Sequence, residues 1–252
     1  MTIARMTRRE FGVSVGAALA SVSLSGACGS SEATSDGRLT ARPRAGVATS
    51  ASGERPLGLG GRRDAILQMP SKEKSGPLPL LVLFHGAGGS GENMLHRLGS
   101  VPDEAGVAVL APDSRGGTWD AIRGAFDADV TFVNRALERV FETVTVDPAR
   151  ITLAGFSDGA TYALSLGLIN GDWCPKVVAF SAGFIVEGPV HGKPRFFMSH
   201  GTADEILPID RCGRPIAASL RKSGYDVTLR EFNGGHAVPP EIAREAFAWV
   251  AS

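Results

Sequence analysis

One short segment of the chain has the residue types of a nucleophilic site. Residues 155–159 read GFSDG, which has the form Gly-x-Ser-x-Gly. In a glycine-rich chain this pattern is weak unless a strand precedes it and a helix follows it. Residues 151–154 form an apolar, strand-like run, and residues 160–169 have a helical pattern. We therefore predict that Ser157 is a nucleophile at the top of a sheet, where the helix N-terminus stabilises negative charge.

A serine hydroxyl needs a base that takes its proton, and the chain has five histidines. His236 follows two glycines in a loop between the last predicted strand and the last predicted helix, so it can fold over the sheet. His85 and His200 each end a strand in a His-Gly pair and are expected to bond to backbone. His96 in a predicted helix and His191 in a loop are expected to be solvated. These placements favour His236 as the base.

The base in turn needs a carboxylate that fixes its tautomer. Asp204 follows the strand-like run that ends near His200, so it is expected at the same sheet edge as Ser157. Glu205 is the neighbouring alternative, and a pair of solvated loop carboxylates is the plainer interpretation. With Asp204 the chain order becomes Ser, Asp, His, which is the order of an α/β-hydrolase triad.

Negative charge that develops in an acyl-transfer transition state needs hydrogen-bond donors. The N–H of Asp158, next after the serine, is one candidate. The loop at 85–90 follows an early strand and has no phosphate-binding lysine, so it does not match a P-loop. We predict the N–H of Ala87 as the second donor, with Gly86 as the alternative.

A further segment, 113–120, follows another predicted strand end and is expected at the rim of the same site. Trp119 in this segment is predicted to bind substrate, by contact with an acyl or aromatic group of the substrate. Packing beneath the loop is the alternative for this side chain, and the sequence does not decide between the two.

The elements that must position these residues alternate along the chain. The strand-like runs lie at 65–69, 80–84, 107–111, 151–154, 177–180, 196–198 and 225–232, and the helical patterns at 130–144, 160–169, 216–222 and 240–250. Such alternation predicts an α/β fold, with a mostly parallel sheet and helices on both faces. The connection between Ser181 and Arg195 is too short for a lid domain, so we expect an open site.

Four segments together resemble a known family: residues 84–89, 155–159, 200–209 and 234–236. They are similar to the small lidless α/β-hydrolases of the phospholipase/carboxylesterase group, whose relatives include acyl-protein thioesterases, feruloyl esterases and polyhydroxybutyrate depolymerase-like esterases. The resemblance implies the α/β-hydrolase fold and no cofactor. It also implies a triad and an oxyanion hole, made of Ser157, Asp204, His236, Ala87 and Asp158.

The chain departs from this family at one position beside the serine. Thioesterases of the group usually have glutamine there, and this chain has Asp158. A backbone donor does not depend on the side chain, so the oxyanion hole is kept. The departure weakens a thioesterase interpretation, and a carboxylate at the site disfavours anionic substrates.

The expected activity is hydrolysis of a carboxylic ester, small or polymeric, through an acyl-enzyme. A peptidase or thioesterase with the same triad is the rival enzyme, and a non-catalytic binding protein on the same fold is the rival of another class. The complete triad argues against a pure binding role. The sequence determines neither the acyl group nor the oligomeric state.

Composition excludes several other functions. The 252 residues have a formal net charge of zero, so nucleic acid is not an expected partner. Three cysteines do not form a disulfide framework. Cys174 and Cys212 are predicted at opposite ends of the sheet, too far apart to pair. No histidine or cysteine spacing suits a metal.

Residues 1–27 are predicted to be an export signal. Arg8 and Arg9 lie in a segment that resembles a twin-arginine signal, which a receptor reads. The apolar run at 11–27 is too short and too rich in Gly and Ser for a span of about 20 apolar residues. We expect export across a bacterial inner membrane, to a secreted, periplasmic or lipid-anchored location.

The end of this signal resembles a lipobox. Cys28 would be the lipidated residue and the protein's one contact with a membrane, although Leu24 lies one position earlier than the pattern prefers. Ser25 and Ala27 also suit ordinary signal-peptidase cleavage. Residues 28–56 have almost no large apolar side chains and are predicted to be a flexible tether. The catalytic domain is then expected at 57–252.

Overall fold

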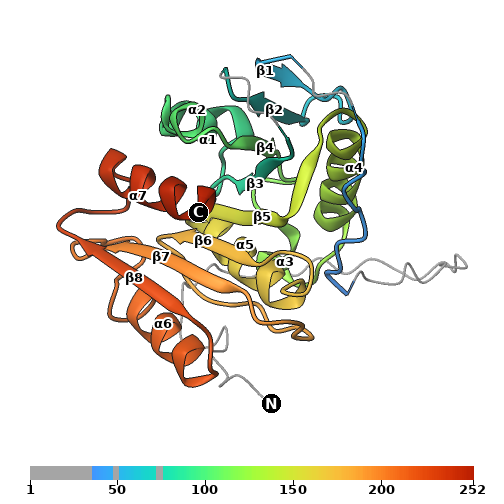
Figure 1. The fold of residues 1–252 in the computed structure, drawn as a ribbon. Helices are drawn as coiled ribbons and strands as arrows, with labels where there is room; N and C mark the ends of the chain where they lie inside the picture. Colours follow the sequence, from blue (N-terminus) through green and yellow to red (C-terminus); the bar gives the residue numbers. More distant parts are fainter. Residues whose placement is uncertain (1–35, 48–50, 72–75) are drawn as a thin grey trace, which may run out of the picture.

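A mostly parallel sheet lies at the centre of the molecule (Figure 1). The computed structural model describes residues 36–47, 51–71 and 76–252. The strands are β1 (Gly53–Pro56), β2 (Ala65–Met69), β3 (Leu78–Phe84), β4 (Ala108–Pro112), β5 (Val146–Phe156), β6 (Lys176–Phe180), β7 (Arg195–Gly201) and β8 (Val227–Phe232). The helices are α1 (Gly91–Leu98), α2 (Val101–Ala105), α3 (Asp120–Arg123), α4 (Ala128–Thr143), α5 (Asp158–Ile169), α6 (Gly213–Lys222) and α7 (Pro240–Ala251).

The strands are ordered β1-β2-β4-β3-β5-β6-β7-β8 across the sheet. From β4 to β8 all neighbours are parallel, whereas β1 and β2 pair antiparallel at one edge. Parallel neighbours place the carboxyl ends of β3, β5, β7 and β8 at one edge of the sheet. Side chains that follow these strands can therefore meet there.

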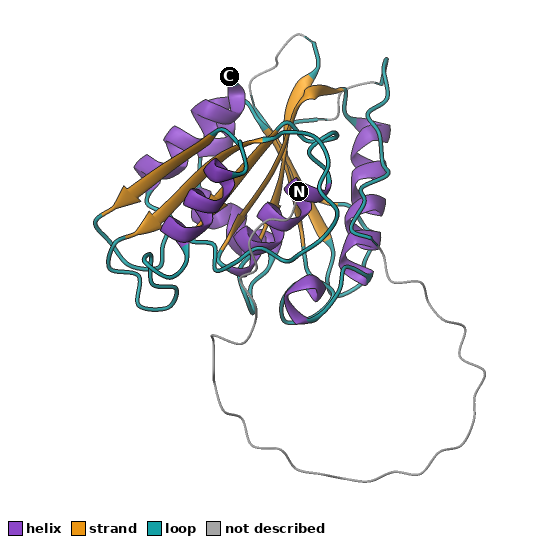
Figure 2. Ribbon diagram, turned by 90° about the horizontal axis from the view of Figure 1, so that it is seen from below, coloured by secondary structure: helices purple, strands orange, loops and turns teal. Residues whose placement is uncertain are grey.

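Helices cover both faces of the sheet (Figure 2). Every residue of β3 is buried, because its side chains alternate between two apolar clusters. Leu80, Val82 and Phe84 pack in the cluster that contains α4, α5 and α6. Leu81 and Leu83 pack in the cluster that contains α1, α2 and α7. The α/β fold predicted from the alternation of patterns is confirmed.

Four elements were not predicted as such, and all are short or polar. β1 spans four residues, α3 four and α2 five, which is too few to show a periodicity. The helix α1 was expected only around His96. Each of these elements is stabilised by its neighbours in the fold, so local sequence pattern is a poor guide to it.

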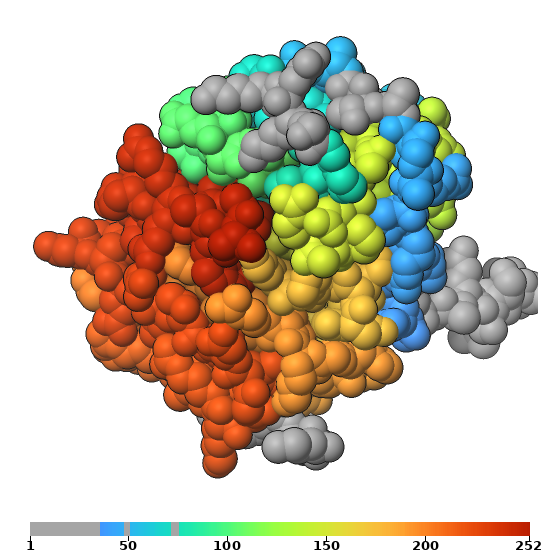
Figure 3. Space-filling model, in the orientation of Figure 1, coloured from blue at the N-terminus to red at the C-terminus, as the bar shows by residue number. Residues whose placement is uncertain are grey.

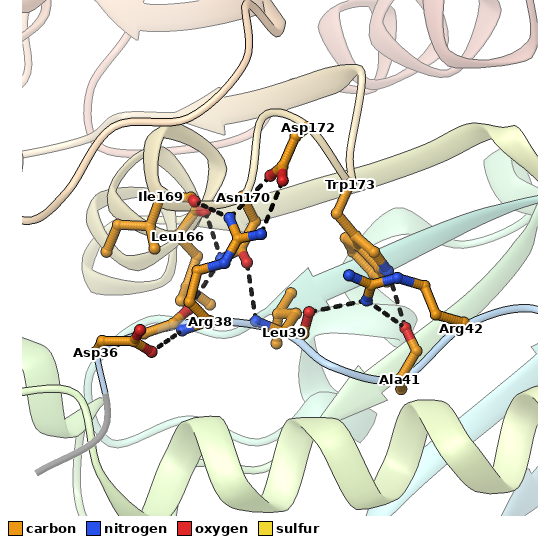
Figure 4. Close-up of polar contacts among 11 residues, drawn as sticks. Asp36, Arg38, Leu39, Ala41, Arg42, Leu166, Ile169, Asn170, Asp172 and Trp173 are labelled. Atoms are coloured by element: carbon orange, nitrogen blue, oxygen red, sulfur yellow. Dashed lines mark hydrogen bonds and ion pairs between the residues drawn. The ribbon is translucent and has the colours of Figure 1, made fainter.

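The tether prediction is wrong for residues 36–47 and 53–56. Residues 53–56 form β1, and residues 36–47 form an N-terminal strap that packs on the domain near α4 and the end of α5 (Figures 3 and 4). Arg38 makes a two-fold ion pair with Asp172, with both N···O distances 2.8 Å. Leu39 is 1% exposed, so even this polar segment contributes to the core.

Two asparagine side chains hold the backbone of the strap. Asn170 accepts the N–H of Leu39 at 2.8 Å and donates to the carbonyl of Gly37 at 2.9 Å. Asn134 accepts the N–H of Thr40 at 2.7 Å. These amides replace the backbone partners that a neighbouring strand would supply. The folded unit thus includes residues 36–47, which the sequence assigned to the tether.

The predicted export signal and Cys28 lie outside the described residues. Within the described ranges, no helix combines the length and the apolar character that crossing a membrane requires. Cys174 precedes β6 and Cys212 precedes α6, and both thiols are buried and free.

Candidate active site

Ser157 lies in a sharp turn between β5 and α5. Its backbone has φ 58° and ψ −120°, a conformation that is rare for a residue with a Cβ atom. Its N–H donates to the carbonyl of Phe180 at 2.9 Å. A Cβ on Gly155 would overlap the carbonyl of Gly159, and one on Gly159 would overlap the carbonyl of Phe84. Both glycines are therefore required for strand and helix to approach so closely.

The loop after β8 brings His236 to this turn. His236 Nε2 lies 2.9 Å from Ser157 Oγ, and His236 Nδ1 lies 2.7 Å from Asp204 Oδ2. The three side chains thus form one continuous hydrogen-bonded chain. With the carboxylate as acceptor, Nδ1 carries the hydrogen, and Nε2 is free to accept the serine proton.

Asp204 lies in the turn after β7 and its carboxylate is fully buried. Its Oδ1 accepts the N–H groups of Ile206 at 3.0 Å and Leu207 at 2.8 Å. Burial acts most strongly and would raise the pKa of Asp204, but the bonds from Leu207 and His236 outweigh it and hold the pKa below its usual value. Glu205, the alternative acid, is exposed. Of the two carboxylates, only Asp204 lies at the histidine.

The loop that contains the predicted oxyanion donor Ala87 lies beside the serine. A Cβ on Gly86 would lie 3.3 Å from that of Ser157, so the 86–89 loop lies against the nucleophile. Within the described residues, the N–H groups of Ala87 and Asp158 make no hydrogen bond to the protein. The loop is fixed by a 2.7 Å bond from Gly88 N–H to the carbonyl of Gly117.

His85 anchors the base of this loop and does not reach the serine. It is buried, its Nδ1 donates to the carbonyl of Gly86 at 2.7 Å, and its Nε2 accepts the N–H of Ser114 at 3.0 Å. This pattern assigns the neutral Nδ1–H tautomer, and burial lowers the pKa of His85 accordingly. The expectation of a histidine bonded to backbone is confirmed. His96 and His191 are exposed.

The prediction that Trp119 binds substrate is wrong. Its side chain is 0% exposed, and its indole N–H donates to the carbonyl of His85 at 2.8 Å. The ring stacks on Tyr162, with ring centroids 4.8 Å apart. A large apolar ring gains more by burial than by exposure at a rim. Trp119 therefore supports the oxyanion loop from below.

Thr118, the neighbour of this tryptophan, contacts the site instead. Its hydroxyl donates to Asp158 Oδ2 at 2.5 Å. The bond joins the segment after β4 to the helix that begins beside the nucleophile. The sequence placed segment 113–120 at the rim, but a threonine hydroxyl has too many local partners for this bond to be foreseen.

In the residues that the structure describes, no group of three or more His, Cys, Asp or Glu side chains is arranged to hold a metal ion.

Comparison with known proteins agrees with this architecture. The chain belongs to the phospholipase/carboxylesterase family, whose model matches residues 123–250. The chain is 31% identical over 144 residues to "Putative esterase NocK" of Nocardia uniformis subsp. tsuyamanensis. That match covers 52% of this chain and 42% of the relative.

A second relative is acyl-protein thioesterase 1 of Gibberella zeae, which is 30% identical over 41% of this chain and 48% of its own length. The chain thus spans a little under half the length of these curated relatives. Among solved structures, the Staphylococcus aureus fluorophosphonate-binding serine hydrolase FphF has a TM-score of 0.63. The match covers 81% of this chain and 100% of FphF at 15% identity, which shows a shared fold.

Proposed function

We propose that this protein is a serine carboxylic-ester hydrolase in which Ser157, His236 and Asp204 form the catalytic triad. The observation that carries the proposal is the continuous hydrogen-bonded chain from the Ser157 hydroxyl through His236 to Asp204. A binding protein has no need of all three groups in this geometry. Membership of a family of phospholipases and carboxylesterases supports the same reaction class.

In the acylation half-reaction, Ser157 Oγ attacks the ester carbonyl while His236 Nε2 takes its proton. Asp204 stabilises the imidazolium that results. The N–H groups of Ala87 and Asp158 donate to the tetrahedral oxyanion. Removal of one such donor typically costs about 3–4 kcal/mol of transition-state stabilisation. His236 then protonates the leaving alcohol, and an acyl-serine remains.

In the deacylation half-reaction, water takes the place of the alcohol. His236 accepts a proton from the water, whose oxygen attacks the acyl carbonyl. Collapse of the second tetrahedral intermediate releases the acid and returns the proton to Ser157.

The substrate is proposed to be a small or polymeric ester without a negative charge near the scissile bond. Asp158 places a carboxylate one residue from the nucleophile, and within the described residues it has no ion-pair partner. Thioester hydrolysis is the second candidate, because two curated relatives are named acyl-protein thioesterase 1.

The test is hydrolysis of chromogenic esters from acetyl to palmitoyl, a feruloyl ester and a matched thioester by the wild type and Ser157→Ala. We expect turnover of esters by the wild type and at least about a 10³-fold loss in the variant. A fluorophosphonate should label the wild type alone. Equal residual rates in both proteins would contradict the proposal and favour the binding-protein alternative.

We also propose that the chain is exported and anchored through Cys28, an inference that rests on sequence alone. Cell fractionation of the wild type, Arg8→Lys/Arg9→Lys and Cys28→Ser in a bacterial host tests it. Export should fail in the arginine variant, and the cysteine variant should be released from the membrane fraction. Release of the wild type itself would indicate ordinary signal-peptidase cleavage.

A further inference from the structure

A second histidine contacts the acid of the proposed triad. His200 lies near the end of β7 and is 1% exposed. Its Nε2 is 2.6 Å from the carbonyl oxygen of Leu207 and 3.3 Å from Asp204 Oδ2. Asp204 Oδ2 therefore lies between two imidazoles, since His236 Nδ1 is 2.7 Å from the same oxygen.

The surroundings of His200 determine its tautomer. A carbonyl oxygen only accepts, so Nε2 must carry the hydrogen. The other ring nitrogen, Nδ1, is buried and has no hydrogen-bond partner in the described residues. A Cβ on Gly213 would lie 2.7 Å from Nδ1, so the ring packs directly on the backbone at the start of α6.

A second proton on this ring would have no acceptor. Burial lowers the pKa of His200, which agrees with a ring that stays neutral. The charged or titratable groups that face it are Asp204, His236 and Glu231, and Glu231 is paired with Arg214. The thiol of Cys212 lies next to Gly213 in the chain, and burial raises its pKa to about 11. His200 is thus a fixed donor and not a proton carrier.

The bonds of His200 close a turn that begins at the acid. Asp204 Oδ1 binds the N–H groups of Ile206 and Leu207, and His200 binds the Leu207 carbonyl. His200 gives its hydrogen bond to that carbonyl, and the same nitrogen also lies 3.3 Å from Asp204 Oδ2. Rotation of the Asp204 carboxylate away from His236 would break contacts on both sides.

We propose that His200 is a positioning residue, which holds the Asp204 carboxylate and its turn in the orientation that His236 requires. The expected effect on rate rests on the proposed function. The claim that His200 orients Asp204 does not depend on it. Without this donor, the Leu207 carbonyl would lose the bond that closes the turn, and the turn presents the N–H groups that hold Asp204 Oδ1. A misplacement of about 1 Å in an active site can cost about 10²-fold in rate.

The experiment compares His200→Asn with His200→Gln in the otherwise complete protein. The amide nitrogen of glutamine can reach the position of Nε2, whereas that of asparagine lies near the position of Nδ1. Both are neutral amides, so the pair is matched in polarity. Kinetics are measured on the best ester substrate, with the active fraction of each protein counted by fluorophosphonate titration.

We expect His200→Asn to lower kcat per active site by about 10- to 100-fold with KM nearly unchanged. His200→Gln should restore most of the rate. The pH dependence of kcat/KM should change in the asparagine variant alone, because the contact between Asp204 and His236 is altered. The low-field NMR resonance of His236 Nδ1–H, assigned by its loss in His236→Ala, should shift or broaden only in that variant.

Equal kcat per active site and equal NMR resonances in the two variants would overturn the proposal. A loss of active fraction with unchanged kcat per site would also overturn it, since that is the mark of a purely structural residue. If the wild type hydrolyses no ester, the proposed function fails. The NMR comparison still decides whether His200 positions Asp204.

Discussion

At the scale of single residues, the nucleophile depends on its glycine neighbours as much as on its own chemistry. Ser157 has a positive φ, which stores strain that the surrounding packing must hold. Gly155 and Gly159 allow this packing, because strand and helix approach so closely there that a side chain would not fit. The pattern Gly-x-Ser-x-Gly is thus a steric requirement of the turn.

Gly159 gives the sharpest test of that requirement. In Gly159→Ala the new methyl group would overlap the carbonyls of Phe84 and His85. We expect the free energy of unfolding to fall by about 1–3 kcal/mol and esterase activity to be lost. Gly124→Ala is the control, because nothing lies within 4 Å of a Cβ there. Equal behaviour of the two variants in urea unfolding would contradict the steric argument.

Thr118 provides a second residue-scale prediction. Thr118→Val keeps the shape of the side chain but removes the donor to Asp158, and a hydrogen bond to a charged group contributes about 1.5–3 kcal/mol. We expect lower stability by up to this amount and a reduced kcat/KM. Thr118→Ser keeps the hydroxyl and should behave like the wild type. A valine variant as stable and active as the serine variant would exclude a role for this bond.

At the scale of elements, the strap at 36–47 is held by residues of α4, of the turn after α5, and of the segment before β6. Arg38 reaches both the carbonyl of Ile169 and the carboxylate of Asp172. The indole N–H of Trp173 donates to the carbonyl of Ala41 at 2.9 Å. The strap lies at the C-terminal end of α5, whereas Ser157 lies at the N-terminal end, about 18 Å away along the helix.

The Arg38–Asp172 pair makes the stability conferred by the strap depend on pH. The hydrogen bond from Arg38 lowers the pKa of Asp172 to about 2. The carboxyl group has a pKa of about 3.9 in the unfolded chain. The stabilisation by the ion pair is therefore complete above that pH and is lost as the pH falls toward about 2. The Asp172 side chain is 46% exposed, so salt should weaken the effect.

Asp172→Asn is the corresponding variant. We expect its midpoint of thermal unfolding to lie below that of the wild type at pH 7, and the difference to shrink as the pH falls from about 4 to about 2. Activity at pH 7 should be unchanged, because the strap is far from Ser157. A stability difference that is constant with pH would mean that the ion pair contributes nothing measurable.

At the scale of the whole molecule, the site lies open at the carboxyl edge of the sheet. The connection between β6 and β7 has no helix or strand of its own, so no lid covers the triad in the described residues. The rate on soluble short-chain esters should therefore follow a simple saturation curve. It should not jump when the substrate concentration exceeds the solubility limit. Such a jump, measured with an emulsified ester, would show that some segment does cover the site.

The sequence by itself determined the order of the longer strands and helices and the proposed triad. Buried parallel strands are apolar throughout, as at 80–84, and such runs are visible without any structure. The nucleophile turn and the loop of Asp204 each follow a strand, and the two His-Gly pairs lie at strand ends. Their meeting at one sheet edge then follows from parallel topology alone.

Only the tertiary structure decided the positions that depend on distant partners. The strap at 36–47 looks like a polar linker, because its partners lie far along the chain: Asn170 is 131 residues from Leu39. Trp119 proved to be buried under the oxyanion loop, and His200 proved to share Asp204 with His236. Local patterns encode periodicity and turns. They do not encode which side chains from separate elements fill the same space, since packing in three dimensions settles that.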